Sequence, residues 1–144
     1  MIDREKIFQA LFALVKDLSG FVTTSRRARL VKDVTPEEQP ALFQEEGPGE
    51  TVKYQKEGLP PIFYLYADLG FYAQIPAGQA PGPVLNPLID ALCTALASPA
   101  DSEAQTLGGL VTYCRIDGKI LKNEGLLDGQ ASVVVPVEIL VLGG

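Results

Sequence analysis

The sequence contains no histidine and no tryptophan, and it has only two cysteines. Without histidine, a Ser-His-Asp triad, a Cys-His nucleophile pair and an imidazole metal site are all excluded. Cys93 and Cys114 form no CxxC motif, and we expect both to be small buried hydrophobic residues; a disulfide between them and a reactive thiol are the alternatives. The sequence therefore lacks the most common general base and the usual cysteine-based metal sites.

Long apolar runs and an excess of basic charge are also missing. No stretch approaches the ~18 uninterrupted apolar residues that a membrane span needs. The mixed charges of Met1–Lys6 are not typical of a secretory signal. The chain has 18 acidic and 12 basic residues, a net charge of −6. This charge argues against a nucleic acid wrapped around the protein, which would need a basic surface. We expect a soluble protein from a reducing compartment with no membrane partner.

The chain has the length and the apolar content of a single globular domain. The chain has 144 residues, of which 47% are hydrophobic and 21% charged. At this length folding can bury roughly two-thirds of the surface of the unfolded chain, so one core is expected over residues 1–144.

The N-terminal third predicts a helix followed by short extended segments. Apolar residues at helical spacing predict a helix over 3–18, with Asp3 as its N-cap. Residues 21–32 predict a strand with one basic side. Thr35-Pro36-Glu37-Glu38 is a capping signature for a single helical turn. Ala41–Glu46 and Thr51–Lys56 predict a hairpin around Gly47-Pro48-Gly49, with an acidic tip of Glu45, Glu46 and Glu50.

Residues 62–75 give the strongest pattern in the chain. Every odd position from Phe63 to Ile75 is apolar, while the even positions include Tyr64, Tyr66, Asp68 and Tyr72. A period of two over fourteen residues predicts a long strand with one face in the core and a second, amphipathic face.

The C-terminal half predicts one helix and two strands. Asn86-Pro87 is expected to open a helix over 86–97. Residues 110–121 predict a strand with a turn or bulge at Asp117-Gly118, and 123–130 a connection. Residues 131–142 predict a last strand, at an edge or bulged where Pro136 lacks a donor. The order indicates an α+β fold: a mainly antiparallel sheet of about four main strands plus a short hairpin, with two helices packed on one face.

Candidate catalytic groups are few. Leu107-Gly108-Gly109 precedes a strand, whereas phosphate-binding glycine loops precede a helix, so we interpret it as a turn. The paired acids at 37–38 and 45–46 lie in turns where nothing raises a carboxyl pKa. Asp68 is interpreted as a structural carboxylate. We predict no enzyme activity, catalytic residue, metal or cofactor.

The residues that carry a functional hypothesis are arginines, glutamates and tyrosines. Tyr and Arg are enriched at interface cores. The even faces of strands 62–75 and 131–142, and the outer face of helix 86–97, carry apolar surface beyond what one two-layer core can use. We therefore predict a subunit or partner interface formed by Arg26, Arg27, Arg29, Glu45, Glu46, Glu50, Tyr64, Tyr66 and Tyr72.

Three stretches together resemble a known family. The first is the opening helix with Thr23–Arg29. The second is the segment Val34–Gln44, which leads into Leu59-Pro60-Pro61 and the long strand. The third is Asn86–Leu92 with Gln105–Val111 and the closing strands. Over about residues 2–142 the chain resembles the tail terminator (tail completion) proteins of long-tailed phages. Thr35 departs from the more Pro-rich turn expected in the family.

The resemblance implies a structural protein of the virion, assembled in the host cytoplasm. It implies a ring, typically of six copies, on the head-proximal end of the tail tube, which stops tube polymerisation and offers a surface to the head–tail connector. Partners would be other copies of the chain, the tube protein and the connector, with DNA passing through the lumen unbound. An acidic net charge suits such a channel, because it repels phosphates.

Two alternatives remain open. A head–tail connector or head-completion protein is also a small ring-former. A monomeric ligand-binding or enzyme domain would instead use tyrosines and Asp68 in a concave pocket. A solution mass near 15.4 kDa favours the monomer, and about six times that mass favours the ring.

Overall fold

The computed structural model describes residues 2–127 and 129–143. In this part of the chain, two α-helices and two 3-10 turns accompany seven strands. The helical elements are α1 (Arg4–Val15), η1 (Val31–Asp33), η2 (Pro36–Glu38) and α2 (Gly82–Ala95). The strands are β1 (Thr23–Ser25), β2 (Ala41–Glu46), β3 (Thr51–Lys53), β4 (Ile62–Gln74), β5 (Tyr113–Ile116), β6 (Leu121–Leu127) and β7 (Gln130–Leu142).

The strands form a single mixed sheet built around β4 and β7. Its order is β1-β2-β4-β7-β5, with β3 also pairing with β4 and β6 with β7. Only the pair β1–β2 is parallel among the described strands; the others are antiparallel. The predicted α+β class is confirmed, although the sheet has more strands than expected.

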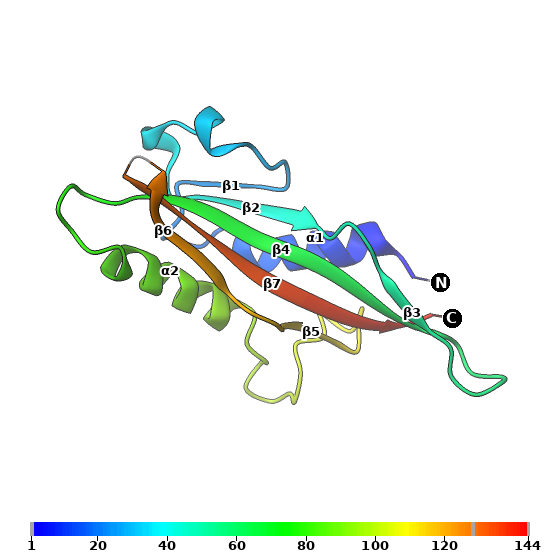
Figure 1. Cartoon of the computed structure of the whole chain (residues 1–144). Helices are drawn as coiled ribbons and strands as arrows, with labels where there is room; N and C mark the ends of the chain where they lie inside the picture. Colours follow the sequence, from blue (N-terminus) through cyan, green and yellow to red (C-terminus); the bar gives the residue numbers. More distant parts are fainter. Residues whose placement is uncertain (1, 128, 144) are drawn as a thin grey trace.

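Both helices cover the same face of the sheet, as predicted (Figure 1). Leu11 of α1 and Leu92 of α2 belong to one buried cluster with odd-numbered residues of β4 and β7. Fully burying side chains of this kind stabilises the fold by roughly 1.5–3 kcal/mol each. The side-chain carboxylate of Asp3 accepts a hydrogen bond from the Lys6 N–H, which confirms Asp3 as the N-cap of α1.

The long strands follow the sequence pattern closely. In β4 the odd positions Leu65, Leu69 and Phe71 are at most 1% exposed, and in β7 the odd positions from Ala131 to Val141 are buried. Thirteen residue pairs join the two strands. The pattern of period two therefore predicted which face of each strand lies in the core.

The predicted hairpin between β2 and β3 is wrong. β2 pairs with residues 67–72 of β4 and β3 with residues 62–64, both antiparallel. The two strands thus follow one another along the same edge of β4, and Gly47–Glu50 is an interruption between them. The Gly47 N–H still donates to the Tyr66 carbonyl at 2.7 Å. The true hairpin joins β3 to β4 through residues 54–61 (Figure 1).

Three other boundaries differ from the prediction. Residues 21–32 contain only the three-residue strand β1, and η1 follows. α2 begins at Gly82 rather than at Asn86, so Pro87 lies inside the helix. Pro87 is the sixth residue of the helix, so α2 lacks the hydrogen bond that an N–H at this position would give to the Pro83 carbonyl. The predicted connection 123–130 is mostly strand β6.

Pro136 lies in an inner strand, so the edge alternative is wrong. β7 is paired with β4 on one side and with β5 and β6 on the other. The Asp117 N–H donates to the Pro136 carbonyl at 3.1 Å, so the imide nitrogen of Pro136 faces the gap where β5 has ended and β6 has not begun. The missing donor therefore costs no ladder hydrogen bond.

The two cysteines differ in environment. Cys114 is 1% exposed, as expected, and burial raises the pKa of its thiol to about 12. Cys93 lies on the outer side of α2 and is exposed, contrary to expectation, because the buried stripe of the helix passes through Leu88, Ile89 and Leu92. Both are free thiols.

Candidate assembly surface

The face of the sheet opposite the helices is only partly covered, and we call it the open face. The even-numbered residues of β4 and β7 point to it, including Tyr64, Tyr66 and Tyr72 of β4, which are half-buried. Their neighbours on β7 include Val134, Leu140 and Leu142, and Leu142 is 51% exposed. All three predicted tyrosines therefore share one surface.

The three tyrosines are held by different contacts. The Tyr66 hydroxyl lies 3.1 Å from Thr51 Oγ1, and the Tyr72 hydroxyl donates to the Arg29 carbonyl at 3.3 Å. The Lys53 ammonium lies 5.3 Å from the centre of the Tyr64 ring. Burial, together with the negative charge of Glu45, raises the pKa of Tyr72.

A fourth tyrosine on the open face was missed by the sequence reasoning. Tyr113 of β5 lies opposite Leu140, and its hydroxyl donates to Glu138 Oε1. Burial and this hydrogen bond raise the pKa of Tyr113 to about 12. The Arg115 guanidinium lies 4.1 Å from the centre of its ring. Alternation with the buried Cys114 was the signal that could have placed Tyr113 here.

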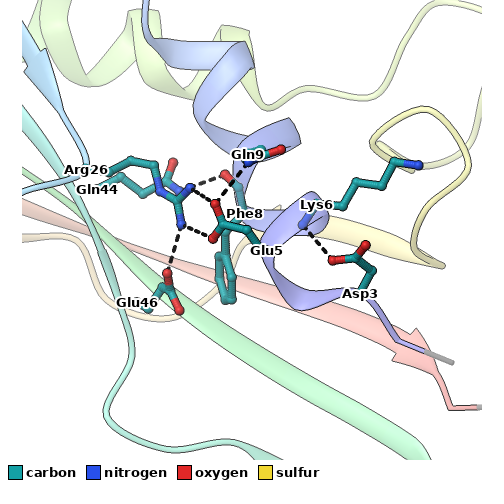
Figure 2. Close-up of polar contacts among 8 residues, drawn as sticks. All are labelled: Asp3, Glu5, Lys6, Phe8, Gln9, Arg26, Gln44 and Glu46. Atoms are coloured by element: carbon teal, nitrogen blue, oxygen red, sulfur yellow. Dashed lines mark hydrogen bonds and ion pairs between the residues drawn. The ribbon is translucent and has the colours of Figure 1, made fainter.

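The three predicted arginines do not act as one cluster. Arg26 donates to both carboxylate oxygens of Glu5 at 2.8 and 2.9 Å and to Glu46 at 2.9 Å, which links α1 to β2 (Figure 2). Beside it, the Gln44 side-chain amide donates to the Phe8 carbonyl at 3.0 Å, a second link between the same elements (Figure 2). Arg26 is therefore committed to contacts within its own chain.

Arg29 is also paired within the chain, whereas Arg27 is not. Arg29 donates to Glu38 at 2.7 Å and lies 5.7 Å from the centre of the Phe43 ring. Glu38 also accepts from the Thr35 N–H, which completes the predicted capping box. These hydrogen bonds lower the pKa of Glu38 to about 2, and the bond from Arg29 has the largest effect. Among the described residues, Arg27 has no ion pair.

Of the three predicted acidic residues, two form ion pairs within the chain and one does not. Glu50 pairs with Arg4 at 2.8 Å, and Glu46 with Arg26. Glu45 lies directly opposite Asp68 in the β2–β4 register, on the open face, and neither carboxylate has an ion-pair partner in the described part of the chain. Like charges directly opposite each other on a sheet destabilise it. The predicted acidic tip is thus a stretch of sheet edge in which Glu46 and Glu50 form ion pairs, while Glu45 faces Asp68 and has no basic partner among the residues that the structure describes.

Two adjoining depressions lie on the open face, and we call them together the Asp68 groove. One is a hollow of about 200 Å³ whose lining includes Arg29, Glu45, Asp68, Gly70 and Tyr72. The other, of about 340 Å³, is lined by Gly47–Thr51, Tyr66 and Asp68. Asp68 borders both. Gly49 and Gly70 contribute to the groove, because each leaves open space where a side chain would stand.

The loop of the β3–β4 hairpin projects beyond the end of the sheet, and we call residues 54–61 the arm (Figure 1). Tyr54 is 84% exposed and Leu59 is 54% exposed. Gln55 Nε2 donates to the Pro60 carbonyl at 2.7 Å, and the Leu59 N–H to the Lys56 carbonyl at 3.0 Å. The arm therefore has an ordered turn with apolar side chains that its own chain leaves uncovered.

Neither a metal centre nor a membrane helix is found in the described ranges. Residues 2–127 and 129–143 contain no group of three or more Cys, Asp or Glu side chains placed to hold a metal ion. In the same residues, no helix combines the length and the apolar character required to cross a bilayer. What the site does offer is a surface of tyrosines, aliphatic residues and unpaired carboxylates, which suits contact with another macromolecule.

Comparisons with known proteins show a structural likeness but no likeness in sequence. No family model matches the chain, and no curated protein matches it by sequence. Among solved structures, the chain is similar to a chain from the structure titled "Virion of native gene transfer agent (GTA) particle". The TM-score is 0.51 at 12% sequence identity, over 95% of this chain and 92% of that one.

This likeness shows a shared fold over nearly the full length of both chains. At 12% identity it rests on the arrangement of helices and strands rather than on shared side chains. The likeness therefore carries no information on the groove, the arm or the ion pairs, whose roles follow from the geometry of this chain.

Proposed function

We propose that this chain is a non-enzymatic structural protein of a phage-like particle. In this proposal, copies of the chain form a ring, of about six as the family resemblance implies, at the head-proximal end of the tail tube. The ring stops tube polymerisation and offers the attachment surface for the head–tail connector. The DNA passes through its lumen without specific binding.

The observation that carries the proposal is the partly exposed tyrosine face of a sheet whose fold is similar to that of a virion chain over nearly its full length. Tyr64, Tyr66, Tyr72 and Tyr113 lie on this face beside aliphatic residues of β7. A surface of this composition is typical of interface cores, because tyrosine combines a large apolar area with a hydrogen-bonding hydroxyl.

The described surface also supplies two unlike patches, as a ring requires. Head-to-tail contacts close into a ring only when one patch of each copy fits a different patch of the next. The open face is one such patch. The arm, the outer face of α2 around the exposed Cys93, and the free Arg27 lie elsewhere on the chain.

Imaging of particles made without this protein tests the proposal. Tails of irregular and excessive length, with no heads attached, are expected because nothing stops the tube from growing. Re-expression of the protein from a plasmid should restore uniform tails and serves as the control. Tails of normal length without the protein would contradict the terminator role.

The same images separate the proposal from the head–tail connector alternative. A connector resides on the head, so its loss leaves tails of normal length beside filled heads that lack tails. Finding the protein in purified heads rather than in purified tubes, by mass spectrometry of the two fractions, would favour the connector.

The monomeric ligand-binding alternative is tested by solution mass. Volume does not decide this alternative, because the hollow lined by Gly47–Thr51, Tyr66 and Asp68 has about 340 Å³, within the roughly 300–1,000 Å³ of small-molecule pockets. Sedimentation at high protein concentration is expected to show a species of about six times 15.4 kDa. Tyr66→Glu is expected to shift it to monomer, with an unchanged circular dichroism spectrum as the control for folding.

A further inference from the structure

The arm and the end of β3 together form a projecting turn that is apolar and weakly basic. Residues 51–59 are all exposed, and among them Val52, Tyr54 and Leu59 are large apolar side chains with little cover. The arm and the end of β3 carry Lys53, Lys56 and Glu57, a net charge of +1. Exposed apolar residues gathered on a projecting, ordered turn indicate a surface that another molecule covers.

The Asp68 groove offers an open strand position at its floor. Its floor includes Gly70, at the middle of β4, and a Cβ placed there would meet only the Val133 carbonyl at 3.7 Å. Nothing within the chain therefore requires glycine at this position, although glycine inside a strand costs about 0.5–1 kcal/mol. Strand glycines without such a reason often mark a close approach by another chain.

The charges of groove and arm are also complementary. Glu45 and Asp68 face each other across β2 and β4 without a cation between them. The remaining charged groups at the groove are Arg29, which is already paired with Glu38, and Glu50, which is paired with Arg4. A lysine entering the groove would remove the repulsion between two carboxylates.

The arm does not reach the carboxylates of Asp68 and Glu45 in its own chain. It leaves the sheet at Ile62, six residues along β4 from Asp68, which at about 3.3 Å per residue corresponds to roughly 20 Å. Figure 1 shows the arm pointing away from the sheet beyond this end. A molecule that brings an arm to these carboxylates must therefore be a second copy.

We propose that the arm of one copy lies in the Asp68 groove of the next, with Lys56 between Glu45 and Asp68 and the apolar arm residues against Tyr66 and Tyr72. The contact joins unlike patches, and its repetition forms a ring when the rotation from one copy to the next closes. This inference rests on the proposed ring and identifies the surfaces that would form it.

The first test fills the groove without harming the fold. Gly70→Val adds a β-branched side chain at an open strand position, so the monomer should unfold at the same or a higher temperature than the natural protein. In sedimentation experiments, the concentration for half-assembly should rise by about tenfold or more, because the arm no longer fits. Equal assembly of Gly70→Val and the natural protein would overturn the inference.

The second test reverses the charges. Lys56→Glu should weaken assembly by about tenfold or more, since it places three carboxylates together. Combining Lys56→Glu with Glu45→Lys and Asp68→Lys should restore it. Lys119→Glu makes the same change on an exposed residue of the β5–β6 turn and is the matched control. Equal losses for Lys56→Glu and Lys119→Glu would overturn the inference.

The results separate this contact from the proposed function. If the natural protein forms rings and both arm and groove variants form them equally well, the arm contact is wrong and the ring stands. If the natural protein forms no ring at any concentration and its absence leaves tails unchanged, both are wrong. Loss of rings in Gly70→Val and Lys56→Glu with rescue by charge reversal supports both.

Discussion

Arg26 and Glu5 form a two-bond ion pair that joins the segment after β1 to the first turn of α1, with N–O distances of 2.8 and 2.9 Å. The same guanidinium also holds Glu46 at the end of β2. A planar guanidinium suits this arrangement because it can donate several bonds in fixed directions, which an ammonium group cannot. The pair therefore fixes the helical layer against the edge of the sheet.

Arg26→Ala should lower the thermal stability of the protein more than Arg27→Ala. The first change removes three charge-assisted bonds, whereas Arg27 has no ion pair among the described residues. Exposed pairs contribute little individually, so we expect a fall of only a few degrees in Tm. Calorimetry in low salt measures it. A larger loss for Arg27→Ala would contradict the arrangement.

Gly47→Ala should destabilise the fold, and Gly49→Ala should not. A Cβ at Gly47 would stand 2.9 Å from Tyr66 Cβ and 3.1 Å from the Tyr66 carbonyl oxygen, so the backbone must shift, at a cost of about 1–3 kcal/mol. A Cβ at Gly49 meets nothing within 4 Å. Urea unfolding of both variants checks the difference. Equal midpoints would show that β2 does not approach β4 as closely as described.

Glu38→Gln should remove an acid-sensitive contribution to stability. The pKa of Glu38 is lowered from 4.5 to about 2 in the folded protein, chiefly by Arg29. A lowered pKa stabilises the fold above the unfolded value, and the contribution is lost as pH falls from about 4.5 toward 2. The difference in unfolding midpoint between the natural protein and Glu38→Gln should therefore be largest above pH 5 and vanish near pH 2. Glu37→Gln, whose side chain makes no hydrogen bond in the described structure, is the control.

The two thiols should differ sharply toward alkylation. Cys93 is exposed and should react with iodoacetamide in the folded protein. Cys114 is 1% exposed, and its pKa is raised to about 12, so thiolate forms there only after unfolding. Mass spectrometry at pH 8 should show one adduct per chain without denaturant and two with it. Two adducts on the folded protein would contradict the burial of β5.

The parts of the fold that the sequence predicted are those in which one local pattern decides the structure. The alternation in β4 and β7 and the Asp3 cap are of this kind. The β2–β3 hairpin was wrong because Gly47-Pro48-Gly49 has the residues of a turn, while the outcome depended on partners some twenty residues away in β4. Local residues do not distinguish a chain that turns back from one that bulges and continues.

The site was predictable in part for the same reason. The tyrosines of β4 follow from period two, so their shared face could be named in advance. The arginines could not be separated, because β1 ends at Ser25 and the residues after it no longer alternate. Which of them finds a carboxylate depends on Glu5 and Glu38, in elements whose positions the sequence does not give.

Pro136 has a consequence for the correctness of folding. Its carbonyl receives the Asp117 N–H, and its nitrogen has no hydrogen to offer on the same side. If β5 slid by two residues along β7, Arg115 would lie opposite Pro136 instead of Glu138. The Arg115 carbonyl would then face a nitrogen that has no hydrogen to donate. Pro136 thus penalises the nearest misaligned pairing of β5 with β7 that keeps apolar side chains inward, and so selects the native register of these two strands.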